Sequence, residues 1–220
     1  MDYKKEIIQR LNGLSGSRSP YEVFCDWIKC FALAIQNQCM IFRRDAVWKK
    51  REEQYIQAIR PYGESGKVFS EMSALLIQAL GEEITDILGQ IYMEAGLGNK
   101  NTGQFFTPFH GVSCACARIL LTGEDGGRRV SMHEPSCGAG GMVIAAAVIL
   151  KEKGIDYQRC LDVVAQDLDW KAVYMCYIQL SLLGIRAVVV QGNTLTEPYQ
   201  KGRTDPERIF YTPKYMGMLL

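Results

Sequence analysis

The chain has 220 residues, of which 48% are hydrophobic and 22% charged, and 25 basic side chains nearly balance 24 acidic ones. This composition is that of a folded globular protein and excludes a disordered, collagen-like or coiled-coil chain. A formal net charge of +1 predicts no strong long-range attraction to nucleic acid, so any DNA contact must come from local basic clusters or from a partner chain.

The first part of the chain predicts helices and no strands. Apolar residues recur at helical spacing in four segments, and turn signals rich in Gly, Pro and Ser separate them. The predicted helices cover residues 21–38, 45–59, 70–80 and 83–95. We therefore expect a helical N-terminal domain over residues 1–100.

The second part alternates between strand and helix patterns. The predicted strands cover residues 128–134, 160–166, 186–191 and 208–212, and the predicted helices cover residues 109–121, 140–154 and 169–184. Buried β-branched strands that alternate with helices are typical of a parallel sheet with crossover helices. We therefore expect an α/β domain over residues 101–220, with a mostly parallel, doubly wound, Rossmann-like sheet that binds its ligand at the carboxyl ends of the strands.

A glycine-rich turn links the first predicted strand to the next helix. Residues 134–142 read E-P-S-C-G-A-G-G-M, and glycines at such a turn let the backbone approach a ligand closely. A tight strand-to-helix turn without a ligand has the same pattern. The first strand ends in Glu134 and the next ends in Asp167, an acid placed to accept hydrogen bonds from ribose hydroxyls. Because Glu134 repels phosphate but suits an amine, the turn favours S-adenosylmethionine over a dinucleotide.

Four short motifs, in order, carry a family resemblance. They read G-Q-F-F-T-P at residues 103–108, E-P-S-C-G-A-G-G-M at 134–142, A-Q-D-L-D at 165–169 and G-N-T-L at 192–195. Together they resemble the motifs of adenine-N6 DNA methyltransferases, in particular the modification subunits of type I restriction–modification systems. The match covers roughly residues 70–197, and the helical N-terminal part resembles that family's helical domain only loosely.

The resemblance implies a role for each matching position. A lip around the methionine end of S-adenosylmethionine would consist of Phe105, Phe106, Thr107 and Pro108. The residues around its amino and carboxylate groups would be Glu134, Ser136, Gly138 and Gly140. Asp167 would bind the ribose, Leu168 would lie against the adenine, and Asn193, where the family usually has Asp, would reach the adenine edge.

The family's catalytic motif, [ND]-P-P-[FYW], does not occur in the chain. The nearest segment is Y-T-P-K-Y at residues 211–215, just after the last predicted strand. Thr212 would replace the Asn, Pro213 would keep the first proline, and Tyr215 would stack on the flipped base. A hydroxyl does not copy a carboxamide, and losing a transition-state acceptor costs roughly 10²–10³ in rate. Lys214 would also place a cation near an amine that becomes positive.

Three functions stay open at this point: a methyltransferase that acts alone, a methyltransferase-fold protein that binds the cofactor with little or no activity, and a subunit that needs a partner. The resemblance implies a core of about seven strands, so we expect a truncated core. Its last strand would form an exposed edge, which a homodimer or a partner subunit would cover.

Other features of the sequence indicate the surroundings of the protein. The chain has eight cysteines but no C-x-x-C pair, two histidines, and no apolar stretch long enough for a membrane span. Its first residues, M-D-Y-K-K-E, are too polar for a signal peptide, so we expect none. We therefore expect a cytoplasmic protein with free thiols, no metal and no membrane contact. Residues 43–51 are basic and contain a tryptophan. They suit either a phosphate contact or a solvated helix face.

Overall fold

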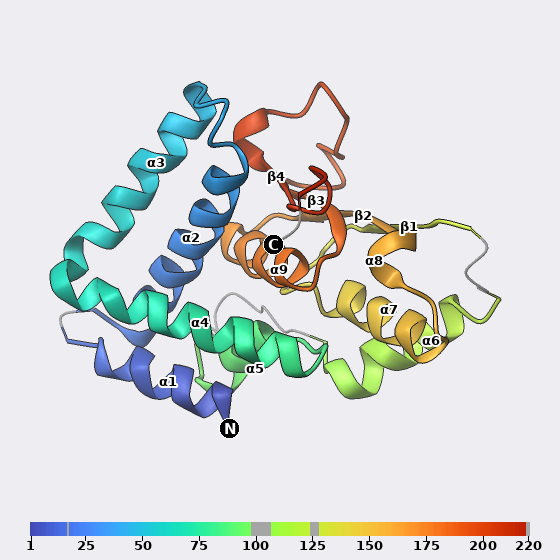
Figure 1. Cartoon of the computed structure of the whole chain (residues 1–220), viewed down its shortest axis with the longest axis horizontal. Helices are drawn as coiled ribbons and strands as arrows, with labels where there is room; N and C mark the ends of the chain where they lie inside the picture. The colour runs from blue at the N-terminus through green and yellow to red at the C-terminus, as the bar shows by residue number, and fades with distance from the viewer. Residues whose placement is uncertain (17, 98–106, 124–127, 219–220) are drawn as a thin grey trace.

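The N-terminal part of the chain is helical, as expected. The computed structural model describes residues 1–16, 18–97, 107–123 and 128–218. Its first helices, grouped in blue and green in Figure 1, are α1 (Tyr3–Gly13), α2 (Pro20–Cys39), α3 (Ala46–Ile59), α4 (Lys67–Glu82) and α5 (Ile87–Glu94), with the 3-10 segment η1 (Arg60–Gly66) between α3 and α4. Helix α1 was not predicted, although Asp2 caps it by accepting from the Lys5 backbone N–H at 3.1 Å.

Helix α2 is the central helix of this group, and its sequence explains both its start and its burial. The Ser19 and Glu22 side chains form a capping box, and Pro20 occupies the first turn, where its missing N–H costs nothing. One stripe of α2 faces the other helices. On that stripe Trp27 is fully buried, and its Nε1 donates a hydrogen bond to Ser73 Oγ of α4 at 3.0 Å.

The second part of the chain forms a mixed α/β layer. In the described residues the sheet has four strands in the order β1 (Val130–Glu134), β2 (Leu161–Asp167), β3 (Arg186–Gln191) and β4 (Ile209–Tyr211). The first three strands are parallel and β4 is antiparallel to β3, so the predicted mostly parallel sheet is confirmed. The connections contain α7 (Gly141–Glu152), α8 (Tyr157–Cys160), α9 (Trp170–Leu182) and the 3-10 turn η3 (Pro206–Arg208).

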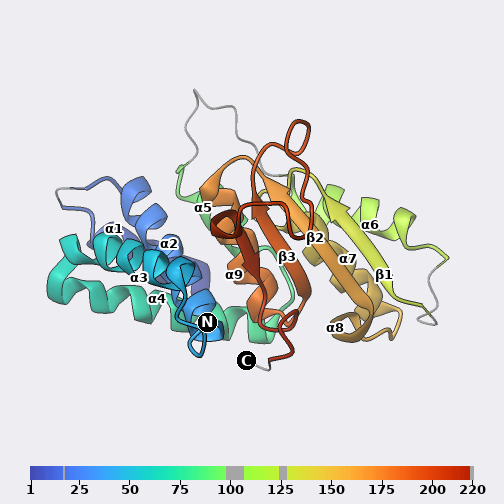
Figure 2. The same cartoon turned by 90° about the horizontal axis from the view of Figure 1, so that it is seen from above.

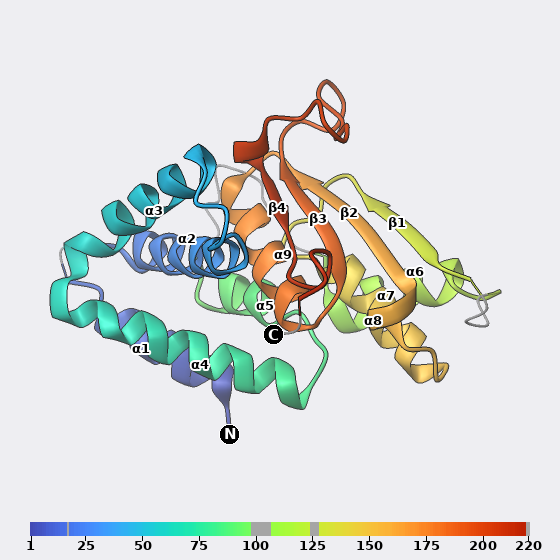
Figure 3. The same cartoon turned by 45° about the horizontal axis from the view of Figure 1, so that its top comes forward.

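The described helices of this layer lie on one face of the sheet, whereas a doubly wound sheet carries helices on both. Figure 3 shows α7 and α9 behind the strands, with α6 (Cys114–Leu120) and its preceding π-helical turn η2 (Phe109–Ser113) beside α7. The strands lie across the sheet in the same order as in the sequence, so each crossover leads to the next strand on the same side of the previous one. Right-handed crossovers that all run this way place their helices on the same face of the sheet. The opposite face carries a smaller apolar cluster of Val188, Val190 and Ile209, with Tyr199, Tyr211 and Tyr215 against it.

The N-terminal helices cover the outer edge of β4. Gln36 Oε1 on α2 accepts a hydrogen bond from the Tyr211 backbone N–H at 3.0 Å, and Arg51 Nη2 on α3 donates to the Ile209 carbonyl at 2.7 Å. The expectation that β4 exposes an edge for a partner to cover is therefore wrong, because this chain's own helices satisfy that edge. Figure 2 shows α2 and α3 on the β4 side of the sheet.

One continuous core joins the helical part to the sheet. A single cluster of buried side chains contains Trp27 and Met72 from the helices and Val163 and Val189 from the sheet. The expected domain boundary at residue 100 lies outside the described residues, so the division into two domains stays a prediction. None of the described helices combines the length and the apolar character that crossing a membrane requires.

Candidate functional site

The two acids singled out in the sequence lie at the same edge of the sheet. Glu134 ends β1 and pairs in register with Ala165, two residues before the end of β2 at Asp167. Both carboxylates are half-buried. Because β1 and β2 are adjacent parallel strands, their carboxyl ends meet where the glycine-rich turn leaves β1.

The turn that follows β1 needs glycine at defined positions. Gly138 and Gly140 have φ values of +53° and +95°, which side chains disfavour. A Cβ at Gly140 would also lie 3.2 Å from Cys176 Sγ on α9. The turn is thus packed against α9, and α7 begins directly after it.

Asp167 links the glycine turn to the start of α9. Its Oδ2 accepts from the Gly138 backbone N–H at 2.9 Å, and its Oδ1 accepts from the Asp169 backbone N–H at 3.0 Å. A carboxylate offers about four lone-pair sites, so each oxygen keeps one for a further donor. Glu134 Oε1 similarly accepts from the Ser136 backbone N–H at 3.3 Å. The residues expected around an amino group and a ribose are thereby brought together.

The loop after β3 joins the same site. Thr194 Oγ1 donates to the Pro135 carbonyl at 2.7 Å, which ties this loop to the glycine turn. Asn193 is half-buried, and its Oδ1 accepts from the Leu195 backbone N–H at 3.0 Å. Leu168 is 67% exposed, so an apolar side chain next to Asp167 faces solvent. Three of the four motifs therefore converge at one edge of the sheet.

The fourth motif is only partly described. Thr107 and Pro108 are exposed and lead into η2, whereas Phe105 and Phe106 lie outside the described residues. The expected lip around the methionine end of the cofactor stays a prediction for all four positions.

Gln179 on α9 is a supporting residue that the sequence analysis missed. It is fully buried, and its Nε2 donates to the Ala139 carbonyl of the glycine turn and to Asp86 Oδ1, both at 2.8 Å. Its Oε1 accepts from the backbone N–H groups of Ile87 and Leu88 at 2.8 and 3.0 Å. One amide thus holds the turn, α9 and the start of α5 together. The sequence did carry one signal for this role, a polar amide among the apolar residues of a helix.

Asp86 is the buried acid of this network. It caps α5, because its Oδ1 also accepts from the Gly89 backbone N–H at 2.8 Å. Burial raises the pKa of this carboxyl, and the hydrogen bonds from Gln179 and Gly89 oppose that rise. Asp86 therefore supports the turn from behind and is not exposed to a ligand, since only 4% of it is accessible.

Cys137 sits inside the turn as a packing residue. A hydrogen bond with Cys176 and, next, burial raise the pKa of its thiol well above the ordinary value. It therefore stays protonated and is a poor nucleophile. All eight cysteines are free. Within the described ranges, no group of three or more His, Cys, Asp or Glu side chains is placed to hold a metal ion.

The residues considered for catalysis lie elsewhere. Thr212 is fully buried; its Oγ1 donates to the Ile185 carbonyl at 2.8 Å and accepts from the Ala187 backbone N–H at 2.9 Å, at the start of β3. Asp167, by contrast, is level with Gln191 at the end of β3, about 13 Å along the strand at about 3.3 Å per residue. The reason is that β4 is antiparallel and carries the chain away from the carboxyl edge.

The residues next to Thr212 in the chain are also engaged in packing contacts. Pro213 is buried, and the Tyr215 ring stacks on Tyr211 with centroids 5.2 Å apart. The Arg186 guanidinium lies 4.8 Å from the centre of the Tyr215 ring. The structure therefore does not bring Thr212, Pro213 and Tyr215 together with Glu134 and Asp167.

Comparison with known families identifies the group. Residues 83–217 match the family described as N-6 DNA Methylase. The chain belongs to this family. The match spans more than half of the chain and includes α5, the glycine turn and the sheet, so the expected family is confirmed. No curated protein matches the chain.

The chain is also similar to two solved structures. One is a protein assigned as a class I S-adenosylmethionine-dependent methyltransferase from Listeria monocytogenes, with a TM-score of 0.49 and 14% identity over 89% of this chain and 55% of that one. The other is a type I restriction-modification methyltransferase subunit from Streptococcus thermophilus, with a TM-score of 0.48 and 14% identity over 84% of this chain and 42% of that one. The chain spans about half the length of these proteins.

Proposed function

We propose that this N-6 DNA methylase family member binds S-adenosylmethionine at the carboxyl edge of β1, β2 and β3. The observation that carries the proposal is the direct contact between the Asp167 carboxylate and the Gly138 backbone N–H, with Glu134 at the end of the adjacent strand. An acid next to a glycine turn provides acceptors for hydroxyls and for an amine at a place where backbone can approach a ligand.

The residues present suit this cofactor. Asp167 keeps lone pairs for the ribose hydroxyls, and Glu134 is a half-buried carboxylate for the cationic amino group. The exposed Leu168 offers an apolar surface for the adenine, and Asn193 offers an amide to its edge. Gln179 keeps the turn in place by holding the Ala139 carbonyl. The S-adenosylmethionine sulfonium, when bound, supplies an electrophilic methyl group.

The acceptor that the family implies is the N6 amino group of adenine in DNA, taken out of the base stack. The groups that would hold this base are not supplied by residues 211–215, which lie at the other end of the strands. Among the described strands, β1 pairs only with β2. A strand added in parallel to the free side of β1 would end beside Glu134. We therefore infer that methyl transfer needs such a strand in addition to the described ones.

A non-enzymatic function is the second candidate. The structural hydrogen bonds of Thr212 favour it, since they engage the one hydroxyl that replaces the family's catalytic Asn. In that case the protein would bind S-adenosylmethionine, or a partner, without transferring a methyl group.

Calorimetry with S-adenosylmethionine tests the cofactor site. We expect Asp167→Asn to weaken binding roughly 10- to 100-fold, because a hydrogen bond to a charged group contributes about 1.5–3 kcal/mol. The matched control is Asp162→Asn, at the other end of the same strand, where Asp162 pairs with Arg129 and Arg186. Equal affinity of Asp167→Asn and the unchanged protein, or no binding of the unchanged protein at millimolar cofactor, would contradict the proposal.

Activity is tested separately with DNA and cofactor labelled in the methyl group. We expect no N6-methyladenine above background from this chain alone. Label that appears with the chain alone and is lost in Tyr215→Ala would show that residues 211–215 act in catalysis. That result would refute the need for a further strand beside β1 while leaving the cofactor site intact.

A further inference from the structure

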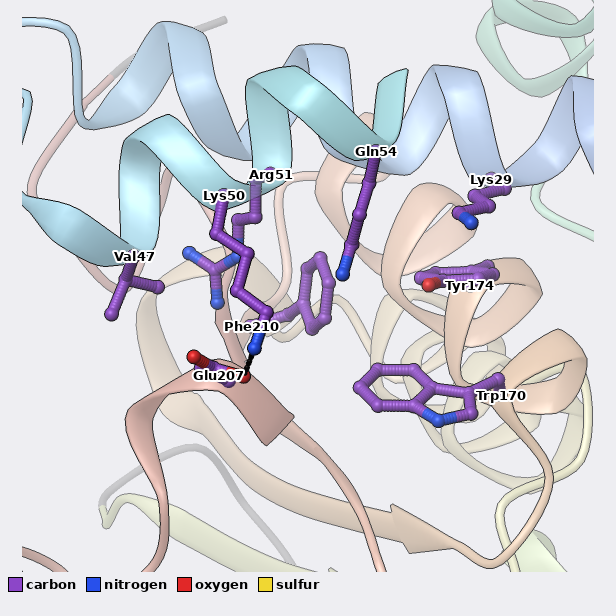
Figure 4. Close-up of a pocket in the computed structure, with 9 residues that line it drawn as sticks. All are labelled: Lys29, Val47, Lys50, Arg51, Gln54, Trp170, Tyr174, Glu207 and Phe210. Atoms are coloured by element: carbon purple, nitrogen blue, oxygen red, sulfur yellow. Dashed lines mark hydrogen bonds and ion pairs between the residues drawn. The ribbon is translucent and has the colours of Figure 1, made fainter. Parts of the chain in front are cut away.

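A cavity outside the proposed cofactor site lies beside the first turns of α9. It has a volume of about 300 Å³, at the lower end of the range for pockets that hold small ligands. Figure 4 shows side chains from α2, α3, α9 and the η3–β4 segment around it. It shares no lining residue with the proposed cofactor site, although Trp170, on its wall, is only three residues after Asp167.

Aromatic rings form one wall of this cavity. Trp170 and Tyr174, one turn apart on α9, stack with centroids 5.5 Å apart and an interplanar angle of 28°. Phe210 of β4 meets both rings edge-on. Trp170 is still 38% exposed, so part of this aromatic surface is open to a guest. Such a wall suits a flat ring, because stacking is favourable for any planar π-system.

Cations form the opposite wall. Lys29, Lys50 and Arg51 line it from α2 and α3, against a single carboxylate, Glu207, which pairs with Lys50. In Figure 4 Lys29 and Gln54 reach from the helices toward the rings of α9. An excess of positive charge beside the rings excludes a cationic guest and favours an anion.

Arg51 is a buried part of this wall and is held in place by several contacts. It is only 5% exposed, its Nη2 donates to the carbonyls of Pro206 and Ile209, and its guanidinium lies 4.8 Å from the centre of the Phe210 ring. Its Nε–H is buried and has no acceptor among the described residues. Burial lowers the pKa of Arg51, but an arginine starts high enough to stay cationic at neutral pH.

We propose that this cavity binds a nucleotide, with the base stacked on the exposed ring of Trp170 and the phosphate held by Lys29 and Arg51. The Gln54 amide, which offers both a donor and an acceptor, faces the same cavity and suits the edge of a base. In this proposal the basic segment at residues 43–51 has a specific role through Arg51, beyond a solvated face.

Equilibrium dialysis with adenosine 5′-monophosphate, on the full chain, tests the proposal. We expect saturable binding that is weaker for adenosine, which lacks the phosphate, and for ribose 5-phosphate, which lacks the base. Phenyl phosphate checks whether any phosphorylated ring suffices. Binding of phenyl phosphate as tight as that of the nucleotide, or no nucleotide binding at millimolar concentration, would overturn the proposal. Displacement by excess S-adenosylmethionine would also overturn it, because the nucleotide would then occupy the other site.

Variants locate the bound nucleotide. We expect Trp170→Ala to weaken binding roughly 5- to 150-fold, the range that corresponds to stacking of one base. Lys29→Gln should weaken it several-fold, and Lys49→Gln is the matched control, because Lys49 is an exposed lysine on α3 that does not line the cavity. Equal effects of the two lysine variants would argue against the site. Unchanged melting temperatures show that the variants fold.

The nucleotide has two possible sources, a free mononucleotide or a unit of single-stranded nucleic acid. A 5′-phosphorylated oligonucleotide of a few bases distinguishes them. Tighter binding of the oligonucleotide, with the same loss in Trp170→Ala, indicates nucleic acid. Binding of the mononucleotide alone indicates a free nucleotide. Oligonucleotide binding that is unaffected by Trp170→Ala places the contact elsewhere and refutes the site.

Discussion

Gln179 shows how much one buried amide can organise around a binding site. Its four hydrogen bonds join the glycine turn, α9 and the first turn of α5, so the chain before residue 100 helps to fix the proposed cofactor site. The Gln179 side chain is fully buried, and its bonds are not competed for by water.

Replacing Gln179 by a side chain of similar size without polar atoms tests this role. We expect Gln179→Met to lower the free energy of unfolding by about 3 kcal/mol or more, because it leaves several buried donors and acceptors unpaired at roughly 1–3 kcal/mol each. Urea denaturation measures this loss. The control is Gln158→Met, since Gln158 is exposed and its side chain donates to the Leu183 carbonyl. A similar effect of both substitutions would contradict the central role of Gln179.

Asp86 predicts a dependence of stability on pH. Burial raises its pKa in the folded chain above the unfolded value of about 3.9, so between these two values the folded state holds the proton more tightly. Stability contributed by this group is therefore present below pH 4 and is lost as pH rises through the folded pKa. In Asp86→Asn this loss should disappear.

The substitution is well suited to the test, because both hydrogen bonds to Asp86 reach Oδ1, which an asparagine retains. Urea denaturation of both proteins from pH 4 to pH 8 gives the difference in unfolding free energy, and we expect it to shift in favour of Asp86→Asn as pH rises. A constant difference would show that Asp86 does not titrate in this range.

At the scale of single elements, the turn before α7 depends on its packing against α9. Gly140 and Gly154 both have positive φ, +95° and +74°, but only at Gly140 would a Cβ contact another side chain, that of Cys176. Backbone strain alone costs about 1–2 kcal/mol for an alanine in this conformation. Overpacking against a neighbour adds about 1–3 kcal/mol.

The two glycines therefore form a matched pair. We expect Gly154→Ala to lower the free energy of unfolding by about 1 kcal/mol and Gly140→Ala by at least about 1 kcal/mol more. Denaturant titration of both variants measures the difference. Equal losses would mean that α9 yields to the added methyl group and that the turn is not tightly packed.

Strand β4 is the element that most changes the functional interpretation. Its antiparallel direction places Thr212 at the beginning of β3, and the side chains of Gln36 and Arg51 satisfy its outer edge. Among the described strands, β1 pairs on one side only, and in the proposed function a further strand on its other side would adjoin Glu134.

At the scale of the whole molecule, the helices and the sheet share one core. Contacts between α2 and α9 are among the most extensive in the structure, and the buried cluster is continuous from α1 to β4. Two parts with a common core lose each other's packing when either unfolds. This predicts a single cooperative unfolding transition.

Thermal unfolding followed by two signals tests that prediction. Two of the three tryptophans, Trp27 and Trp48, lie in the helical part, and the third, Trp170, lies at the start of α9. Tryptophan fluorescence therefore reports mainly on the helical part, whereas far-ultraviolet circular dichroism reports on helices throughout. We expect coincident transitions and a calorimetric enthalpy equal to the van't Hoff value. Two separate transitions would instead favour independent domains divided near residue 100.

The sequence by itself determined the features that depend on neighbouring residues. Apolar spacing gave the positions of α2, α3 and α4 to within about three residues, and alternation of strands and helices gave the parallel order of β1 to β3. The glycine turn and the two acids at strand ends followed from local patterns as well, and so did the family motifs.

Only the tertiary structure decided the features that depend on distant residues. The direction of β4, its cover by Gln36 and Arg51, and the bonds of Gln179 to Ala139 and Asp86 all join segments 25 to 175 positions apart. No period of 2 or 3.6 residues carries such information, because side-chain periodicity reports which face is buried and not what buries it. For the same reason, Thr212 stands in the sequence where the family's catalytic motif would follow, whereas in space it lies at the opposite end of β3 from Asp167.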